Sequence, residues 1–169
     1  MDKIITISRE YGAGGHSIGQ QVAKELGIPF YDRDILKATV QTSGFDPDMV
    51  EHDQEDVSST NFFFKSICSF ADASFSDTQD AIHDVQKAVI LHFAKEGPCV
   101  ILGRCGDYVL RERKDVLRVF VYAPKEWRLQ YAKTNPLVKA KDEKGIKDEV
   151  EKTDRNRSAY YNYYTQNRW

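Results

Sequence analysis

Residues 4–31 read IITISREYGAGGHSIGQQVAKELGIPFY. The β-branched run at 4–7 favours a short buried strand, and a glycine-rich turn follows it. Apolar residues then recur at helical spacing up to Gly27, a natural helix C-cap; they are Ile18, Val22, Ala23 and Leu26. The closing IPFY predicts a second short strand. A strand, a glycine loop, a helix and a strand in this order are the usual opening of a parallel α/β sheet.

The remainder of the chain continues the α/β pattern. Residues 99–102 and 116–122 predict two further strands, and the first of these ends at Gly103 and Arg104. We expect the stretch from 34 to 96 to be mostly helical, with one apolar stripe along 78–95. We therefore expect an α/β fold in three layers, with residues 4–7 in a central strand of a parallel sheet and helices on both of its faces.

Composition narrows the function classes. The 169 residues suit one domain, 1–169, or one domain with a mobile lid, and 41% are hydrophobic. The net charge of -2 provides no basic field, so we expect no nucleic-acid partner. The three cysteines lack zinc-ligand spacing and indicate thiols in a reducing cytoplasm. No long apolar segment or signal-peptide pattern occurs, so we expect no membrane association.

The glycine loop has the chemistry of a phosphate site. Gly12, Gly14 and Gly15 allow backbone N–H groups to point inward at an anion, and the following helix N-terminus adds a favourable dipole. The hydroxyl of Ser17 could ligate magnesium. We therefore predict an anion site over residues 12–17, with a glycine-rich structural turn that binds nothing as the alternative.

The match to the phosphate-loop pattern G-x-x-x-x-G-K-S/T is incomplete. If Gly14 is the second glycine, Arg9 stands in the first position and Gly15 replaces the lysine. If Gly15 is the second glycine, Glu10 stands first and His16 replaces the lysine. We prefer the second alignment, because it keeps a side chain that can become cationic beside the hydroxyl of Ser17.

Arginines follow three predicted strands. Ligands of open α/β sheets bind outside the carboxyl ends of the strands, where Arg9, Arg33 and Arg104 fall. The planar guanidinium suits phosphate because it forms paired charge-assisted hydrogen bonds. Arg9 could equally anchor the loop through Glu10 or Asp32.

A basic and tyrosine-rich segment ends the chain. Within residues 152–157, Asp154 and Arg157 are three apart and could pair on a helix surface, or the segment could be a lid that brings arginines to a transferring phosphate. We expect few residues of 128–157 to be buried and the segment to be mobile without ligand. The tyrosines after it, and the phenylalanines at 62–64, suggest packing or a homo-oligomer contact.

Four stretches resemble the cytidylate kinase-like family, relatives of the bacterial CMP kinases. The opening, IITISREYGAGGHSIGQQVAKELGIPFYDRDIL, is the first, and KTDRNRSAYYNYY near the end is the second. Two shorter stretches, VILGRCGDYVL and VFVYAPKEWRLQ, resemble the family between them. Together they extend over essentially the whole chain apart from the helical middle.

The resemblance implies a P-loop kinase fold, ATP with Mg²⁺ as phosphoryl donor, and a pyrimidine nucleoside monophosphate, CMP or dCMP, as acceptor. It implies a monophosphate-binding insert at about 34–97 and a lid at about 128–157. The donor phosphates would lie against Gly12, Ala13, Gly14, Gly15, His16 and Ser17. Asp32 and Arg33 would open the acceptor region, and Arg104 would hold the acceptor phosphate, with Arg9 beside it. The lid residues would be Arg128, Lys152, Asp154 and Arg157.

The chain also departs from the family pattern. The lysine of true CMP kinases is absent from the loop, and Cys105 replaces the acidic residue after the Gly-Arg pair. The strand that normally follows the lid is missing from the sequence. The hypotheses are therefore an active nucleotide kinase, a catalytically weak nucleotide-binding or regulatory protein, and a structural α/β domain that uses its aromatic clusters for partners.

Overall fold

The computed structural model describes residues 3–32, 75–134, 138, 140 and 142–169. The predictions for Arg33, for most of the insert at 34–97 and for the phenylalanines at 62–64 lie outside these residues. The elements in chain order are β1 (Ile4–Arg9), α1 (Gly15–Leu26), β2 (Phe30–Tyr31), α5 (Phe75–Glu96), β3 (Val100–Leu102), α6 (Gly106–Val109), β4 (Val116–Val121), α7 (Lys125–Thr134) and α8 (Glu143–Thr165).

The sheet is parallel and has the strand order β2-β3-β1-β4. In the register of β1, Ile5 lies opposite Val100 of β3 and Ile4 lies opposite Val116 of β4. β3 is buried throughout and β1 over its first four residues, which explains why both sequences are continuous apolar or β-branched runs rather than alternating ones. The predicted parallel sheet, with residues 4–7 in a central strand, is confirmed.

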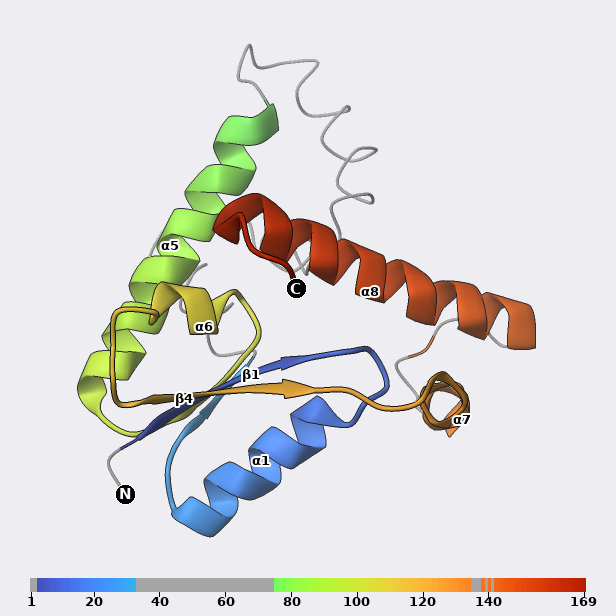
Figure 1. Ribbon diagram of the computed structural model, residues 1–169, viewed down its shortest axis with the longest axis horizontal. Coiled ribbons are helices and arrows are strands. Elements are labelled where there is room, and N and C mark those ends of the chain that lie inside the picture. Colours follow the sequence, from blue (N-terminus) through green and yellow to red (C-terminus); the bar gives the residue numbers. More distant parts are fainter. Residues whose placement is uncertain (1–2, 33–74, 135–137, 139, 141) are drawn as a thin grey trace.

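Helices cover both faces of the sheet (Figure 1). Ile4 and Ile101 point to the face that packs on Val89 and Ile90 of α5. Their strand neighbours, among them Ile5, point to the opposite face, which packs on α1. Each fully buried isoleucine contributes about 1.5–3 kcal/mol by leaving water. The predicted three-layer α/β arrangement is confirmed.

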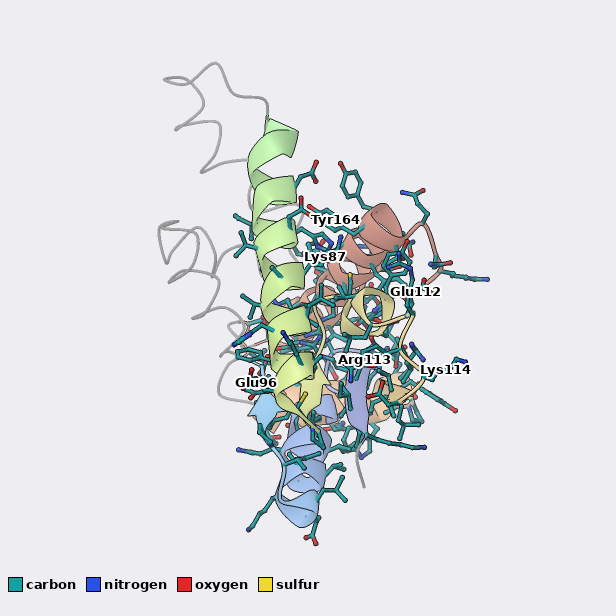
Figure 2. The ribbon with its side chains drawn as sticks, turned by 90° about the vertical axis from the view of Figure 1, so that its left-hand side faces the viewer. Lys87, Glu96, Glu112, Arg113, Lys114 and Tyr164 are labelled. Carbon is teal, nitrogen blue, oxygen red and sulfur yellow. The ribbon has the colours of Figure 1, made fainter. Side chains whose placement is uncertain are left out.

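The long helix α8 packs against α5 by aromatic contacts (Figure 2). The His83 ring of α5 stacks on Tyr164 with centroids 3.6 Å apart, and its Nδ1 lies 2.9 Å from the Tyr160 hydroxyl. The pKa of His83 is lowered to about 4, chiefly by burial, against the opposing effect of Asp84 and with a smaller contribution from Lys87. Near neutral pH this histidine is therefore an uncharged packing residue.

Helices α7 and α8 enclose a small apolar cluster of their own. Its buried members are Ala132, Val138, Ile146 and Val150, and Tyr11 from the glycine loop packs against them. Of the described residues within 128–157, five are buried, namely Arg128, Ala132, Val138, Ile146 and Val150, and the mobility of the segment without ligand stays a prediction. Ile146 and Val150 lie four residues apart on one face of α8, and this apolar stripe packs the N-terminal half of the helix on the cluster.

Within residues 3–32, 75–134 and 142–169, none of the helices is long and apolar enough to cross a lipid bilayer.

Candidate active site

The glycine loop lies between the end of β1 and the start of α1, at the carboxyl edge of the sheet (Figure 1). Gly12 and Gly14 adopt left-handed backbone angles, with φ of 77° and 83°, which glycine enters without steric cost. A Cβ at Gly12 would stand 2.9 Å from the carbonyl oxygen of Arg128, so α7 approaches the loop closely there. The predicted turn residues therefore meet a real backbone requirement.

Helix α1 begins directly after the loop with an open N-terminus. Gly14 is its N-cap residue and supplies no side-chain cap, and its first turn contains no acidic residue. The first backbone N–H groups of a helix have no partner within the helix, so Gly15, His16 and Ser17 present donors at its positive end. His16 and Ser17 are exposed. This arrangement suits a bound anion.

His16, which stands where the phosphate-loop lysine would be, is paired with Asp32. Its Nδ1 lies 3.0 Å from Oδ2 of Asp32, and its ring meets Phe30 edge-on. The contact joins the start of α1 to the residue that follows β2. The sequence placed both residues at the site but did not indicate that they contact each other.

Three arginines converge beside the loop. Arg9, Arg104 and Arg157 line one small cavity at the carboxyl ends of β1 and β3, although they are up to 148 residues apart in the chain. Arg157 donates from Nη1 to the carbonyl of Arg9 at 3.2 Å, and its guanidinium lies over the Tyr11 ring at 5.6 Å. The structure thus brings together three of the predicted site arginines.

Arg104 is held in an uncommon conformation. Its φ is 55° and that of Cys105 is 54°, a region that non-glycine residues rarely adopt, and Arg104 is only 8% exposed. Two consecutive left-handed residues cost energy, so the fold around them must impose the turn. The backbone at Arg104 would suit glycine better than arginine.

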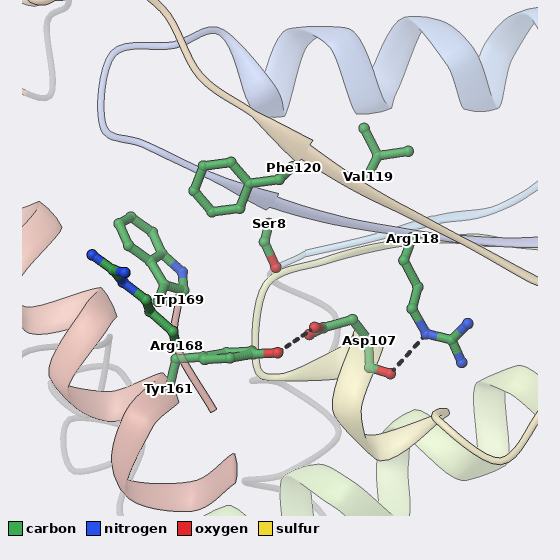
Figure 3. Close-up of a pocket in the computed structure, with 8 residues that line it drawn as sticks. All are labelled: Ser8, Asp107, Arg118, Val119, Phe120, Tyr161, Arg168 and Trp169. Carbon is green, nitrogen blue, oxygen red and sulfur yellow. Dashed lines mark hydrogen bonds between the residues drawn. The ribbon is translucent and has the colours of Figure 1, made fainter. Parts of the chain in front are cut away.

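A second cavity of about 220 Å³ adjoins the arginines and shares Ser8, Tyr161 and Trp169 with the first (Figure 3). The Tyr161 hydroxyl donates to Oδ2 of Asp107 at 2.6 Å. Burial and the Asp107 carboxylate raise the pKa of Tyr161 well above its usual value, so it stays a hydrogen-bond donor. Arg118 and Arg168 also line this cavity.

Sequence reasoning did not select Asp107 or Tyr161. The tyrosines of 160–164 were interpreted together as packing or interface residues. This interpretation fits Tyr160, which is buried and bonds Gln86 and His83, but Tyr161 faces the site. A signal was available for Asp107, which lies three residues after Arg104 at the end of a predicted strand.

The remaining predicted residues lie on α7 and α8. Arg128 is buried and donates from Nη1 to Oδ2 of Asp154 at 2.5 Å. Asp154 in turn accepts from the backbone N–H of Tyr11 at 2.7 Å. Lys152 is exposed on α8. One interpretation of the sequence was a local pair between Asp154 and Arg157. In the structure, Asp154 pairs with Arg128 of α7.

Among the described residues, no group of three or more His, Cys, Asp or Glu side chains is placed to hold a metal ion. Cys99 and Cys105 are buried thiols, and burial raises the pKa of Cys99 to about 11.

The fold and the site define a class. A parallel α/β sheet carries, at one carboxyl edge, a glycine loop that opens a helix and a cavity lined by three arginines, the features of a protein that binds phosphorylated small molecules. The comparisons agree: residues 4–169 match the cytidylate kinase-like family, and the chain belongs to that family. Membership indicates a function of the nucleotide-kinase type.

Solved structures support the same fold. One that matches is an uncharacterized protein from Eubacterium ventriosum ATCC 27560, with a TM-score of 0.68 and 22% sequence identity. The match covers 99% of this chain and 80% of that chain. No curated protein matches the chain.

Proposed function

We propose that the protein transfers a phosphoryl group from ATP to a nucleoside monophosphate, with CMP or dCMP as the acceptor. The observation that carries the proposal is the placement of Arg9, Arg104 and Arg157 in one cavity beside the glycine loop. Phosphoryl transfer requires two phosphate groups held close together, and its catalysis is mostly positioning and charge neutralisation. A site with donors on one side and arginines on the other meets that requirement.

The loop residues fit a donor nucleotide. The amides of 14–17 form an open helix N-terminus, and a Cβ at Gly14 would have its nearest neighbours at 3.9 Å, so space remains above the backbone there. Mg²⁺ bound with the nucleotide would neutralise charge on the donor phosphates. The exposed Ser17 hydroxyl would help to hold it, since Mg²⁺ needs few protein ligands and retains several waters.

The acceptor phosphate would lie at the arginine cavity, which is about 10 Å³ in volume and would have to widen to admit it. Arg104 is buried there and its guanidinium supplies a fixed fork of donors for phosphate oxygens. Arg9 and Arg157 would add charge on either side, with Arg157 closest in role to the catalytic lid arginine that the family resemblance implies. Lys152 is exposed on the same helix, and it would contact the transferring phosphate only if α8 shifted.

A catalytically weak nucleotide-binding protein is the second candidate. Two observations favour it: His16, at the lysine position, is already paired with Asp32, and Cys105, at the acidic position, is buried. A lysine at this position normally reaches the transferring phosphates, so its loss lowers turnover more than binding. The two candidates share the same nucleotide site and differ in turnover.

Trp127 offers a direct reporter of loop occupancy. Its ring lies 3.9 Å from where a Cβ of Gly14 would stand, and 50% of the residue is exposed. The chain has two tryptophans, so a Trp169→Phe variant leaves Trp127 as the single source of tryptophan emission. We expect MgATP to produce a saturable change in this emission, because an anion at the loop alters the field and solvent around the ring.

The control for that titration is Trp127→Phe, in which the remaining Trp169 should respond weakly to MgATP. CMP alone, which lacks the donor phosphates, should change Trp127 emission less than MgATP does. An unchanged Trp127 spectrum at high MgATP concentration, with no heat of binding in calorimetry, would contradict a donor site at the loop.

A further inference from the structure

Tyr11, where the chain enters the glycine loop, is held at both of its backbone polar groups. Tyr11 donates its N–H to Oδ1 of Asp154 at 2.7 Å, and its carbonyl accepts from Nη1 of Arg128 at 3.2 Å. The same Nη1 donates to Oδ2 of Asp154 at 2.5 Å. Tyr11, Arg128 and Asp154 therefore form a closed ring of three contacts, and they come from the loop, α7 and α8.

Glu10 extends this ring to the end of β4. Its Oε2 lies 3.3 Å from Nε of Arg128 and accepts the backbone N–H of Ala123 at 3.3 Å. Nε of Arg128 also donates to the carbonyl of Ala123 at 3.2 Å. One guanidinium thus joins two acidic side chains and two backbone carbonyls, and the Arg128 side chain is only 10% exposed.

Contacts of this kind define position more than they add stability. Burying an ion pair costs desolvation that its attraction roughly balances, whereas removing one partner leaves a buried charge. The backbone of α7 also limits the loop directly, through the 2.9 Å approach of the Arg128 carbonyl to a Cβ position at Gly12. The side chain of Arg128 therefore holds Tyr11, and its main chain limits the space at Gly12.

We propose that Arg128 and Asp154 are positioning residues that hold Tyr11 and Gly12 in the conformation in which the loop amides receive the donor phosphates. The proposal rests on the proposed nucleotide site, and it gives a positioning role to two side chains that the family resemblance assigned only to the lid. The ring also links α7 and α8 to the loop, so a shift of either helix relative to the loop would break one of its contacts.

The chain contains two matched controls. Lys125 and Glu151 pair across the same two helices, three residues before Arg128 and Asp154, but both side chains are partly exposed and touch no loop residue in any contact that the structure records. Arg113 makes a fork-like pair with Asp115 and donates to the carbonyl of Ala94, at the opposite edge of the sheet (Figure 2). It controls for the loss of a structural arginine.

The test combines hydrogen–deuterium exchange of the ligand-free protein with calorimetric titration of MgATP and of inorganic tripolyphosphate. The variants are Arg128→Lys, which keeps charge but loses the fork, Asp154→Asn, Lys125→Ala and Arg113→Ala. We expect the first two to speed exchange of the amides at 12–17 and to weaken both ligands about tenfold or more. The two control variants should stay within about twofold of the parent in both readouts.

Each outcome decides the proposal. Unchanged loop exchange in folded Arg128→Lys or Asp154→Asn protein overturns it, and so does faster exchange with unchanged affinity. If Arg113→Ala lost as much affinity, the effect would reflect a general loss of stability, and the proposal would again be overturned. If the parent binds neither ligand, the proposed nucleotide site fails, while the exchange data still show whether Arg128 and Asp154 hold the loop.

Discussion

Replacing Arg104 with alanine is expected to lower kcat/KM for the acceptor monophosphate by roughly 10²-fold or more, and to leave the affinity for MgATP within about twofold. Arg104 is buried and lines the cavity with Arg9 and Arg157, whereas residues 12–17 of the glycine loop are not part of its lining. Truncation removes a fork of charge-assisted donors from one phosphate only. Steady-state kinetics with each substrate varied in turn separates the two effects.

The matched control is Arg111→Ala, which removes an arginine seven residues away on the exposed surface, where it lies over the Tyr108 ring. This variant should retain parental kinetics for both substrates. If Arg104→Ala weakened MgATP as much as the acceptor, Arg104 would belong to the donor site or to the structure of the turn.

Gly12→Ala is expected to abolish measurable MgATP binding and to lower the free energy of unfolding by about 1–3 kcal/mol. A Cβ at φ 77° is strained, and it would stand 2.9 Å from the backbone carbonyl of Arg128, which cannot swing away as a side chain could. The loop or α7 must therefore shift. Calorimetric titration and denaturant unfolding measure the two effects.

Gly27→Ala separates strain from contact. Gly27 has φ 64° as the C-cap of α1, but nothing lies within 4 Å of a Cβ built there. This variant should lose about 1 kcal/mol of stability and bind MgATP like the parent. Parental binding by Gly12→Ala would show that the loop tolerates the shift and that its observed shape is not needed for the nucleotide.

The sheet could be predicted from the sequence because its strands are short runs of apolar, β-branched residues. β1 over its first four residues and β3 throughout are buried, so these stretches are continuous runs of apolar or β-branched residues. The glycine loop could also be predicted, since its left-handed positions favour glycine. The placement of Arg9 and Arg104 at one edge follows from these elements and the rule for parallel sheets, whereas the order of the strands does not.

The ion pairs of the site could not be predicted, because they join residues far apart in the chain. Tyr11 and Asp154 are 143 residues apart, and Asp107 and Tyr161 are 54 apart. Sequence spacing reveals only local partners, and for Asp154 it offered Arg157, three residues on. Asp154 meets Arg128 because α7 packs on α8, and sequence spacing does not reveal such a tertiary contact.

The most direct measurement of the central claim is phosphoryl transfer itself, followed by phosphorus NMR of the protein with MgATP and CMP. The account predicts that ADP and CDP appear together in equal amounts, that both require the acceptor, and that Arg157→Ala removes most of this turnover while the fold is retained. Arg157 lies in the arginine cavity and over the Tyr11 ring. Bound MgATP with no CDP formed from CMP, and no dCDP formed when dCMP is supplied instead, would contradict the kinase and leave the nucleotide-binding alternative in its place.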